Sequence, residues 1–241
     1  MKTKSLLTAL AVGMALSAMP GAMLADEIFT VTLNTVPLTM APDSGAGPFS
    51  LAFQLVQGDS SNALNTATLS DFTFGGGSAG ACPANCTTFG GFTGDATNSI
   101  GLSTSDGFEA IIQAFTPGSQ LSFQVDLSTN PNTGLAPDDF AFSILDSAGF
   151  PIPTQDGSGA DTFLTVLLDS SDPSVLTYAS DPTTGTVAGD VFISLDAPAI
   201  GTPTVPAGTP EPSTLVLLAC AVAVLFGAAG FVPARDWLFR G

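Results

Sequence analysis

The chain has almost no basic residues and no histidine. Its 241 residues include four Lys and Arg against 21 Asp and Glu, which gives a formal net charge of −17 at pH 7. Nineteen of the acids and none of the bases lie between Asp26 and Pro210. A region without Lys, Arg or His has no positive side chains to neutralise phosphates. This excludes nucleic-acid binding and argues against phosphoryl-transfer and nucleotide-binding enzymes. The lack of histidine also removes the usual catalytic triads, general bases and zinc sites.

Tryptophan and tyrosine occur once each, as Trp237 and Tyr178. Carbohydrate sites usually stack sugars on the flat faces of these side chains, so their scarcity argues against a glycosidase groove and a strong glycan-binding face. Glycoside hydrolysis itself needs only two carboxylates, which the composition supplies. Asp43-Ser44-Gly45 resembles half of an aspartic-protease site, but that site needs two copies and the chain has one. We therefore expect no enzymatic activity, no catalytic residues and no cofactor.

The N-terminal residues 1–25 are typical of a secretory signal peptide. Lys2 and Lys4 form the positively charged N-terminal region of such a peptide. An apolar stretch too short to span a bilayer follows them. We expect cleavage after Ala25, with Ala22 as the alternative position. The protein is thus predicted to be exported, the other interpretation being a buried N-terminal helix.

The C-terminal residues 214–232 form an uncharged, apolar segment. At about 1.5 Å per residue a helix of this length reaches about 28 Å, close to the roughly 30 Å hydrocarbon core of a bilayer. Arg235 and Arg240 follow the segment, so the positive-inside rule places the preceding domain outside and the tail in the cytoplasm. The alternative, a core helix of a soluble domain, is disfavoured because the segment has no polar face.

Pro210-Glu211-Pro212 stands directly before this apolar segment. With the signal peptide, the single span and the basic end, it resembles the PEP-CTERM sorting signal of bacteria that make exopolysaccharide. The resemblance covers residues 210–241 and implies retention in the inner membrane, then processing near Pro-Glu-Pro by an integral-membrane exosortase. Delivery to the cell surface or extracellular matrix would follow. The family usually has adjacent arginines at its end, whereas Asp236 follows Arg235 here; the alternative to a sorting signal is a permanent anchor.

Residues 26–196 are predicted to form an all-β ectodomain, an antiparallel β-sandwich of the jelly-roll-like kind. Short segments alternate apolar and polar residues and are separated by Gly, Pro, Asp and Ser. The expected strands are 28–33, 49–56, 67–74, 121–127, 140–145, 163–168 and 191–195. The Pro/Thr/Gly-rich residues 197–209 are predicted to be a linker. Residues 123–127, 138–149 and 151–154 also resemble the ectodomain of one uncharacterised group of PEP-CTERM proteins.

Two local patterns refine the expected domain. Asp146-Ser147-Ala148-Gly149 is typical of a hairpin with a type I turn, in which Gly149 takes the left-handed conformation. Asp106 and Glu109 have capping-box spacing, and the apolar residues of 108–115 would share one helical face. The same segment leads into Thr116-Pro117-Gly118-Ser119, as the first arm of a hairpin would. We interpret it as a helical turn that runs into a strand.

The cysteines form one further candidate site. Cys82 and Cys86 flank three residues in a Gly-rich stretch of a chain predicted to be exported, which favours a disulfide. A ring this small contributes about 2 kcal/mol and pins a loop. A redox-active pair would need a helix N-terminus or a cation beside it, and neither is evident in the sequence, so the pair is interpreted as structural. Cys220 is interpreted as a small apolar residue of the membrane segment.

Calcium is the one metal that the composition favours, because aspartates accompany Ser and Asn in expected loops. The candidates are Asp138 with Asp139, and Asp169-Ser170-Ser171-Asp172. Neither has the spacing of an EF-hand, so no metal ligand is predicted.

The predicted function is a non-enzymatic surface or matrix protein associated with exopolysaccharide. Its partners are expected to be an exosortase-type protease, the bacterial membrane before processing, and polysaccharide, with no nucleic acid. In this hypothesis the dense negative charge hydrates the matrix or cross-links it through divalent cations. The alternative is a carbohydrate- or protein-binding module displayed at the cell surface. A glycan array would distinguish the two.

Overall fold

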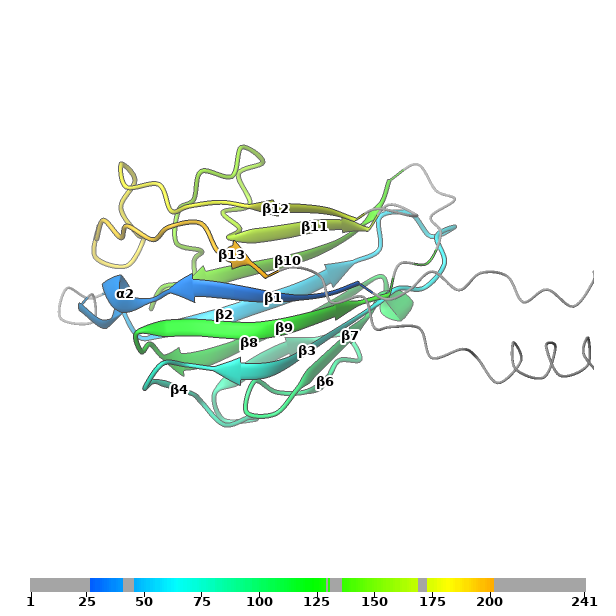
Figure 1. Cartoon of the computed structure of the whole chain (residues 1–241), viewed down its shortest axis with the longest axis horizontal. Helices are drawn as coiled ribbons and strands as arrows, with labels where there is room; N and C mark the ends of the chain where they lie inside the picture. Colours follow the sequence, from blue (N-terminus) through cyan, green and yellow to red (C-terminus); the bar gives the residue numbers. More distant parts are fainter. Residues whose placement is uncertain (1–26, 41–45, 129, 131–135, 169–172, 202–241) are drawn as a thin grey trace, which may run out of the picture. The chain divides into compact units, whose positions relative to one another are not determined.

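The computed structural model of the chain describes residues 27–40, 46–128, 130, 136–168 and 173–201 (Figure 1). All of them belong to the first of two compact units, which spans Met1–Thr204. The expected signal peptide, the linker beyond residue 201 and the C-terminal sorting signal lie outside the described residues. Among the described residues, no helix has the length and apolar character needed to cross a membrane.

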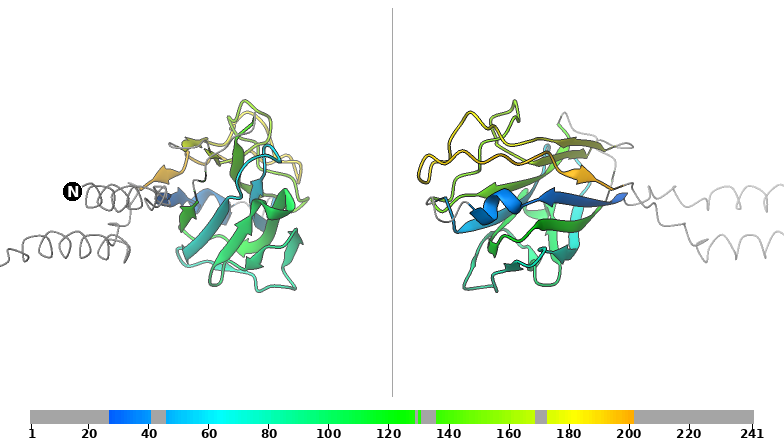
Figure 2. Two further views of the ribbon diagram at one scale, coloured as in Figure 1. Left: turned by 90° about the vertical axis from the view of Figure 1, so that its right-hand side faces the viewer. Right: turned by 60° about the vertical axis from the view of Figure 1, so that its left-hand side comes forward.

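The described residues form two antiparallel sheets, which confirms the all-β prediction (Figure 2). The six-stranded sheet has the order β13 (Ala199–Ile200), β1 (Glu27–Asn34), β9 (Gln120–Leu127), β3 (Thr66–Thr73), β7 (Ile100–Ser103) and β6 (Thr93–Gly94). The seven-stranded sheet has the order β12 (Ser174–Thr177), β11 (Leu164–Leu168), β10 (Asp138–Leu145), β2 (Phe49–Val56), β8 (Phe108–Thr116) and β4 (Ser78–Ala79), with β5 (Cys86–Phe89) also paired to β8. The helices described are only α2 (Val36–Met40) and the 3-10 turn η2 (Thr104–Asp106).

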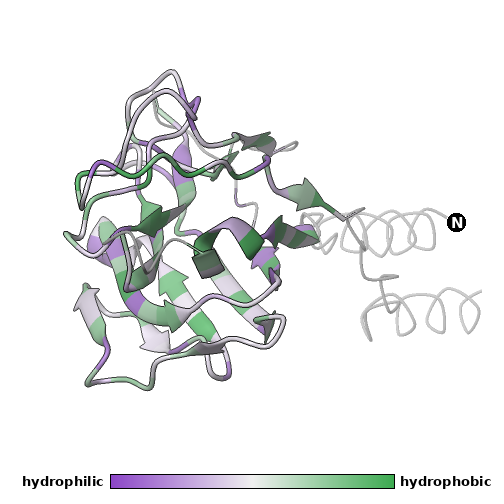
Figure 3. Ribbon diagram, turned by 90° about the vertical axis from the view of Figure 1, so that its left-hand side faces the viewer, coloured by the Kyte–Doolittle hydropathy of each residue, from purple (hydrophilic) through white to green (hydrophobic). Residues whose placement is uncertain are grey.

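Phenylalanine rings fill the space between the sheets. Alternate residues of each strand point inward, so apolar and polar residues alternate along the ribbons (Figure 3). Phe53 of β2 lies 5.3 Å from Phe123 of β9 and 5.1 Å from Phe142 of β10, measured between ring centroids. All three rings are fully buried. This cluster joins the two sheets at their centre, and the edge-to-face pairs between β9 and the opposite sheet are the geometry that aromatic quadrupoles favour.

Six of the seven predicted strands coincide, to within two residues at either end, with β1, β2, β3, β9, β10 and β11. The prediction for residues 191–195 is wrong, because these residues have no ladder partner among the described residues. Ile193 and Leu195 are nevertheless buried. Ser180 takes the place of a neighbouring strand: its hydroxyl donates to the Ile193 carbonyl over 2.8 Å and accepts from the Leu195 amide over 2.7 Å. The alternating pattern was therefore a sign of burial without a ladder.

The predicted helical turn that runs into a strand is confirmed. Its N-cap lies about one turn earlier in the sequence than expected. Ser103, and not Asp106, caps η2 by accepting a hydrogen bond from the Ser105 amide. Glu109 reaches back to accept from the Ser103 amide over 2.8 Å. Gly107 ends the turn with a φ of 77°, and β8 follows directly. The expected hairpin with the next strand is wrong, since β8 and β9 belong to different sheets.

The turn at residues 146–149 has the predicted form. The Gly149 amide donates to the Asp146 carbonyl over 3.0 Å, and Gly149 has a φ of 81°. The Asp146 carboxylate accepts from the amides of Ala148 and Phe150, and also from the amide of Ala188 in a distant loop. The turn is thereby fixed to the segment that follows β12, and it positions the loop that leads back over the seven-stranded sheet.

The chain enters and leaves the described domain on neighbouring strands. Val31 of β1 pairs with Ile200 of β13, and the Gly201 amide donates to the Thr30 carbonyl over 2.7 Å. The ordered domain therefore extends past the boundary at residue 196 that the sequence predicts, and includes the first residues of the expected linker.

Candidate functional site

Several site residues predicted from the sequence lie outside the described residues. They are the signal-peptide position Ala25, the motif residues Pro210, Glu211 and Pro212, and the flanking bases Arg235 and Arg240. The second calcium candidate, residues 169–172, lies outside them too. The described residues therefore belong to the predicted ectodomain and its C-terminal edge, and the sorting signal stays a prediction.

A disulfide joins Cys82 and Cys86, the pair for which the sequence predicts one, with their Cα atoms 5.3 Å apart. The ring is fixed to β8, because the Ala114 amide donates to the Asn85 carbonyl over 2.9 Å. Beyond the ring, β5 pairs with β8 as far as Phe89 opposite Ala110. The disulfide therefore holds a ribbon at the edge of the seven-stranded sheet and helps to position Phe89.

Asp138 and Asp139 do not form the joint calcium site that the sequence suggested. They are successive residues of β10, so their side chains point to opposite faces of the sheet. The Asp138 carboxylate is fully buried and occupied by neutral donors, namely the Gly58 amide and the side-chain amides of Asn62 and Asn65, at 2.8–3.0 Å. Within the described part of the chain, no group of three or more Cys, Asp or Glu residues could hold a metal ion.

The amide cradle around Asp138 is a structural clamp. Asn65 donates to Asp138 and also accepts hydrogen bonds from the Ser128 hydroxyl and the Asn130 amide, so one side chain joins three segments. A Cβ atom at Gly58 would lie only 2.0 Å from the Pro137 carbonyl oxygen, which explains the glycine. Buried polar groups are tolerated only where hydrogen bonds replace water, and the Asp138 carboxyl group accepts from three donors.

Asp139 has a different environment on the outer face of the sheet. Burial raises the pKa of its carboxyl group, and the negative charge of Asp156 raises the pKa further. One of its oxygens, Oδ1, is buried without a hydrogen-bond partner among the described residues. At Asp156 burial opposes ionisation, but hydrogen bonds from Ser158 and Thr162 outweigh it and lower the pKa. The two carboxylates therefore differ in their ease of ionisation.

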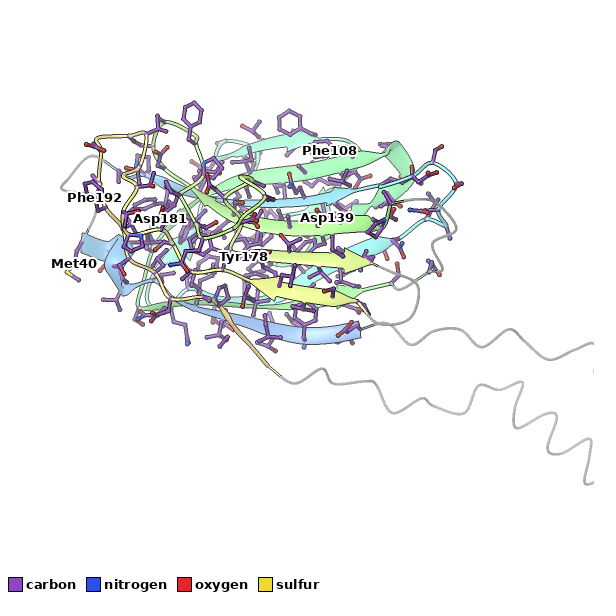
Figure 4. All side chains as sticks on the ribbon, turned by 90° about the horizontal axis from the view of Figure 1, so that it is seen from above. Met40, Phe108, Asp139, Tyr178, Asp181 and Phe192 are labelled. Carbon is purple, nitrogen blue, oxygen red and sulfur yellow. A yellow bond between two sulfur atoms is a disulfide. The ribbon has the colours of Figure 1, made fainter. Side chains whose placement is uncertain are left out.

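A groove crosses the outer face of the seven-stranded sheet, with a volume of about 260 Å³. Its floor consists of residues from the three central strands: Ala52, Gln54, Ala110, Ile112, Ala141 and Ser143. Phe89 and Phe108 form one wall, and the loop after β10 forms the other with Gly149, Pro151 and Ala160. We call this feature the outer groove; Phe108 and Asp139 are labelled on this part of the domain in Figure 4.

Strand register explains the shape of the outer groove. Gln54 of β2 lies opposite Ala110 of β8 on one side and Ala141 of β10 on the other. In the next row, Ala52 lies opposite Ser143. Small side chains thus occupy adjacent positions on neighbouring strands and leave a depression from which the Gln54 amide projects.

The outer groove is not among the features that the sequence predicts. Its signal was present in the outward positions of the predicted strands, where Ala52, Ala110, Ala141 and Ser143 replace the larger polar residues usual on a solvent-facing sheet surface. Which of these residues become neighbours depends on strand order, and the periodicity of one strand says nothing about that order. The wall from residues 149–160 depends likewise on a loop that folds back over the sheet.

No protein-family model, no curated protein and no solved structure matches this chain. The outer groove offers two aromatic rings, one side-chain amide and one hydroxyl, which together form a surface suited to binding.

Proposed function

We propose that the chain is an exported, non-enzymatic protein of the bacterial cell surface or extracellular matrix. The observation that carries the proposal is the uncharged segment 214–232 directly behind Pro210-Glu211-Pro212, with Arg235 and Arg240 after it. Such an arrangement suits one membrane span with a cytoplasmic basic end. Its resemblance to the PEP-CTERM signal supplies the targeting mechanism.

In this mechanism the signal peptide, residues 1–25, initiates export and is removed after Ala25. The apolar helix then halts the chain in the inner membrane. Glu211 stands between two prolines, which lack an amide proton and favour extended backbone in the residue before them. The Pro-Glu-Pro segment therefore presents an extended substrate to an exosortase-type membrane protease, which releases the body to the surface.

The architecture of the described domain supports a tethered, jelly-roll-like body. The first three strands alternate between the sheets, and β9 lies between β1 and β3. Strands distant in sequence thereby become neighbours, as in jelly rolls. The Gly201 amide bonds to the Thr30 carbonyl, so both ends of the domain emerge from adjacent strands. A body that begins and ends at one place leaves its remaining surface free for partners.

The charge of the body supports a role in a hydrated matrix. Between Asp26 and Pro210 the chain carries 19 acids and no base. Copies of such a domain repel one another at low ionic strength and bring a dense layer of counterions and water. Divalent cations bridging carboxylates on different copies or on polysaccharide would cross-link this layer, which fits the expected association with exopolysaccharide.

The described carboxylates support the non-enzymatic part of the proposal. Acid–base chemistry at Asp139 would need a second accessible group nearby. Asp156 is only 9% exposed, and its oxygens accept hydrogen bonds from Ser158 and Thr162 at 2.8–2.9 Å. A buried carboxylate engaged in this way is poorly placed to exchange protons with a substrate.

The intact mass of the protein recovered from the cell surface tests the proposed function. The full chain expressed in an exosortase-bearing bacterium is expected to yield a surface form that begins at Asp26 and lacks Trp237. The Glu211→Ala variant should stay in the inner membrane with Trp237 attached, whereas Pro203→Ala, a control in the linker, should be processed normally. A surface form that keeps Trp237 would show that the segment is an anchor.

A further inference from the structure

We propose that the outer groove binds a neutral polysaccharide chain, with sugar rings stacked on Phe89 and Phe108 and hydroxyl groups bonded to Gln54. The proposal rests on the proposed function only in placing the domain where polysaccharide is present. The binding chemistry is derived from the outer groove itself.

The aromatic wall supplies the stacking surface. Phe89 is 48% exposed and Phe108 is 41% exposed, and their ring centroids are 6.3 Å apart on neighbouring strands. Exposed rings beside a hollow usually mark a binding surface, because their contact with water is unfavourable until a ligand covers them. The electron-rich faces of the rings attract the slightly positive C–H groups of a sugar. These two phenylalanines thus provide the ring faces that carbohydrate sites usually take from tryptophan and tyrosine.

The floor supplies the polar contacts. Gln54 lies between Ala110 and Ala141, and no hydrogen bond of its side-chain amide is found among the described residues. The Ser143 hydroxyl donates to the Asp161 carbonyl over 3.3 Å and keeps its lone pairs for a ligand. An amide that both donates and accepts, next to a hydroxyl acceptor, matches the paired donors and acceptors of sugar hydroxyl groups.

Charge decides which polysaccharide fits. The chain has no Lys, Arg or His between Asp26 and Pro210, and no ionisable side chain lines the outer groove. Asp139 lies two residues from Ala141 on the same face of β10, at the end of the floor. An anionic sugar would meet only repulsion there and in the field of the whole domain. A neutral, hydroxyl-rich chain matches the site without that penalty.

The form of the outer groove suits a chain better than a compact ligand. Its volume of about 260 Å³ is below the roughly 300–1,000 Å³ of sites that enclose a drug-sized molecule. It is partly open to solvent, so a polymer can lie in it over a short stretch and continue outside it. An extended peptide would be less well served, because a sheet face offers none of the free backbone groups that an added strand needs.

The test is affinity electrophoresis of the full chain, kept in a detergent whose headgroup is not a sugar. The gels contain dextran, mixed-linkage β-glucan or galactomannan as neutral probes, and alginate as the anionic probe. With EDTA in the gels to remove divalent cations that would bridge carboxylates, we expect retardation in at least one neutral gel and none in alginate. Phe89→Ala and Phe108→Ala should each weaken retardation by up to about tenfold, and Gln54→Ala by a few-fold.

Phe192→Ala is the matched control, since Phe192 is 60% exposed, does not line the outer groove and is labelled at the other end of the view from Phe108 (Figure 4). It should migrate as the unsubstituted chain does, and circular dichroism should show all four variants folded. Migration unaffected by any neutral probe would overturn the proposal, as would equal losses for Phe108→Ala and Phe192→Ala, or retardation in alginate alone. Export is measured separately by the mass of the surface form, so either proposal can fail without the other.

Discussion

The two faces of the seven-stranded sheet carry side chains of very different size, although the same strands supply both. On the inner face, Phe53 and Phe142 stack at 5.1 Å and contact the opposite sheet through Phe123. On the outer face, the positions next to them in sequence are Ala52 and Ala141. The inner face is filled by its own residues, whereas the outer face leaves a hollow. Stability is thus concentrated on one side of the sheet, and the opposite side is available for binding.

Loss of a ring from the inner face should have the largest effect on folding. Phe53→Ala is expected to lower the free energy of unfolding by about 3–5 kcal/mol, because the ring is fully buried among three others. Phe108→Ala removes the same atoms from the outer face and should cost within about 1 kcal/mol, since that ring is exposed. Urea unfolding followed by circular dichroism measures both. Equal losses would abolish the distinction between the faces.

Asp138 is a polar group on the inner face of the seven-stranded sheet. Its removal should lower the free energy of unfolding somewhat less than removal of the Phe53 ring. Asp138→Ala leaves the donors of Gly58, Asn62 and Asn65 without their acceptor in a fully buried site. We expect a loss of about 2–4 kcal/mol in the free energy of unfolding. Asp181→Ala is the control, because Asp181 accepts its hydrogen bonds at the surface and its loss should stay within about 0.5 kcal/mol. If both variants unfold alike, the clamp has no structural role.

Asp139, the next residue along the chain, should give the smallest effect and the opposite sign. Burial raises the pKa of its carboxyl group in the folded state above the ordinary value of 3.8. Stability from such a group is fully present below that value and is lost as the pH rises through the folded pKa. Asp139→Asn should therefore leave Tm unchanged in acid and raise it at about pH 7 by about 1–2 °C. Thermal unfolding across this pH range measures the difference, and a lower Tm at neutral pH would contradict it.

Much of the fold could be predicted from the sequence, because alternation reports which side of a strand is buried. The burial of residues 49–56 alternates without a fault, and these residues form β2 as expected. The same signal failed at residues 191–195, where Ser180 supplies the hydrogen bonds of a missing neighbour. Periodicity measures burial, and it cannot show whether a backbone finds a ladder partner.

The outer groove could not be predicted from the sequence for a related reason. The disulfide pair could be predicted from spacing within one loop. The outer groove instead depends on Gln54 coming to lie between Ala110 and Ala141, which are far apart in sequence. Asp138 and Asp139 are adjacent in sequence, which suggests one site, but a strand places them on opposite faces of the sheet. Adjacent positions in the sequence therefore wrongly suggest a joint site at the carboxylates, and the long sequence separation of the strands hides which residues form the floor of the outer groove.

A fluorescent reporter in the wall of the outer groove tests the central claim most directly. Trp237 is the only tryptophan of the chain, so Phe108→Trp combined with Trp237→Phe places a single indole beside the groove. Titration with the three neutral polysaccharides should shift its emission to shorter wavelength, because a sugar ring that covers the indole excludes water. Phe192→Trp in the same background should not respond. A response at residue 192 with none at residue 108 would contradict the account.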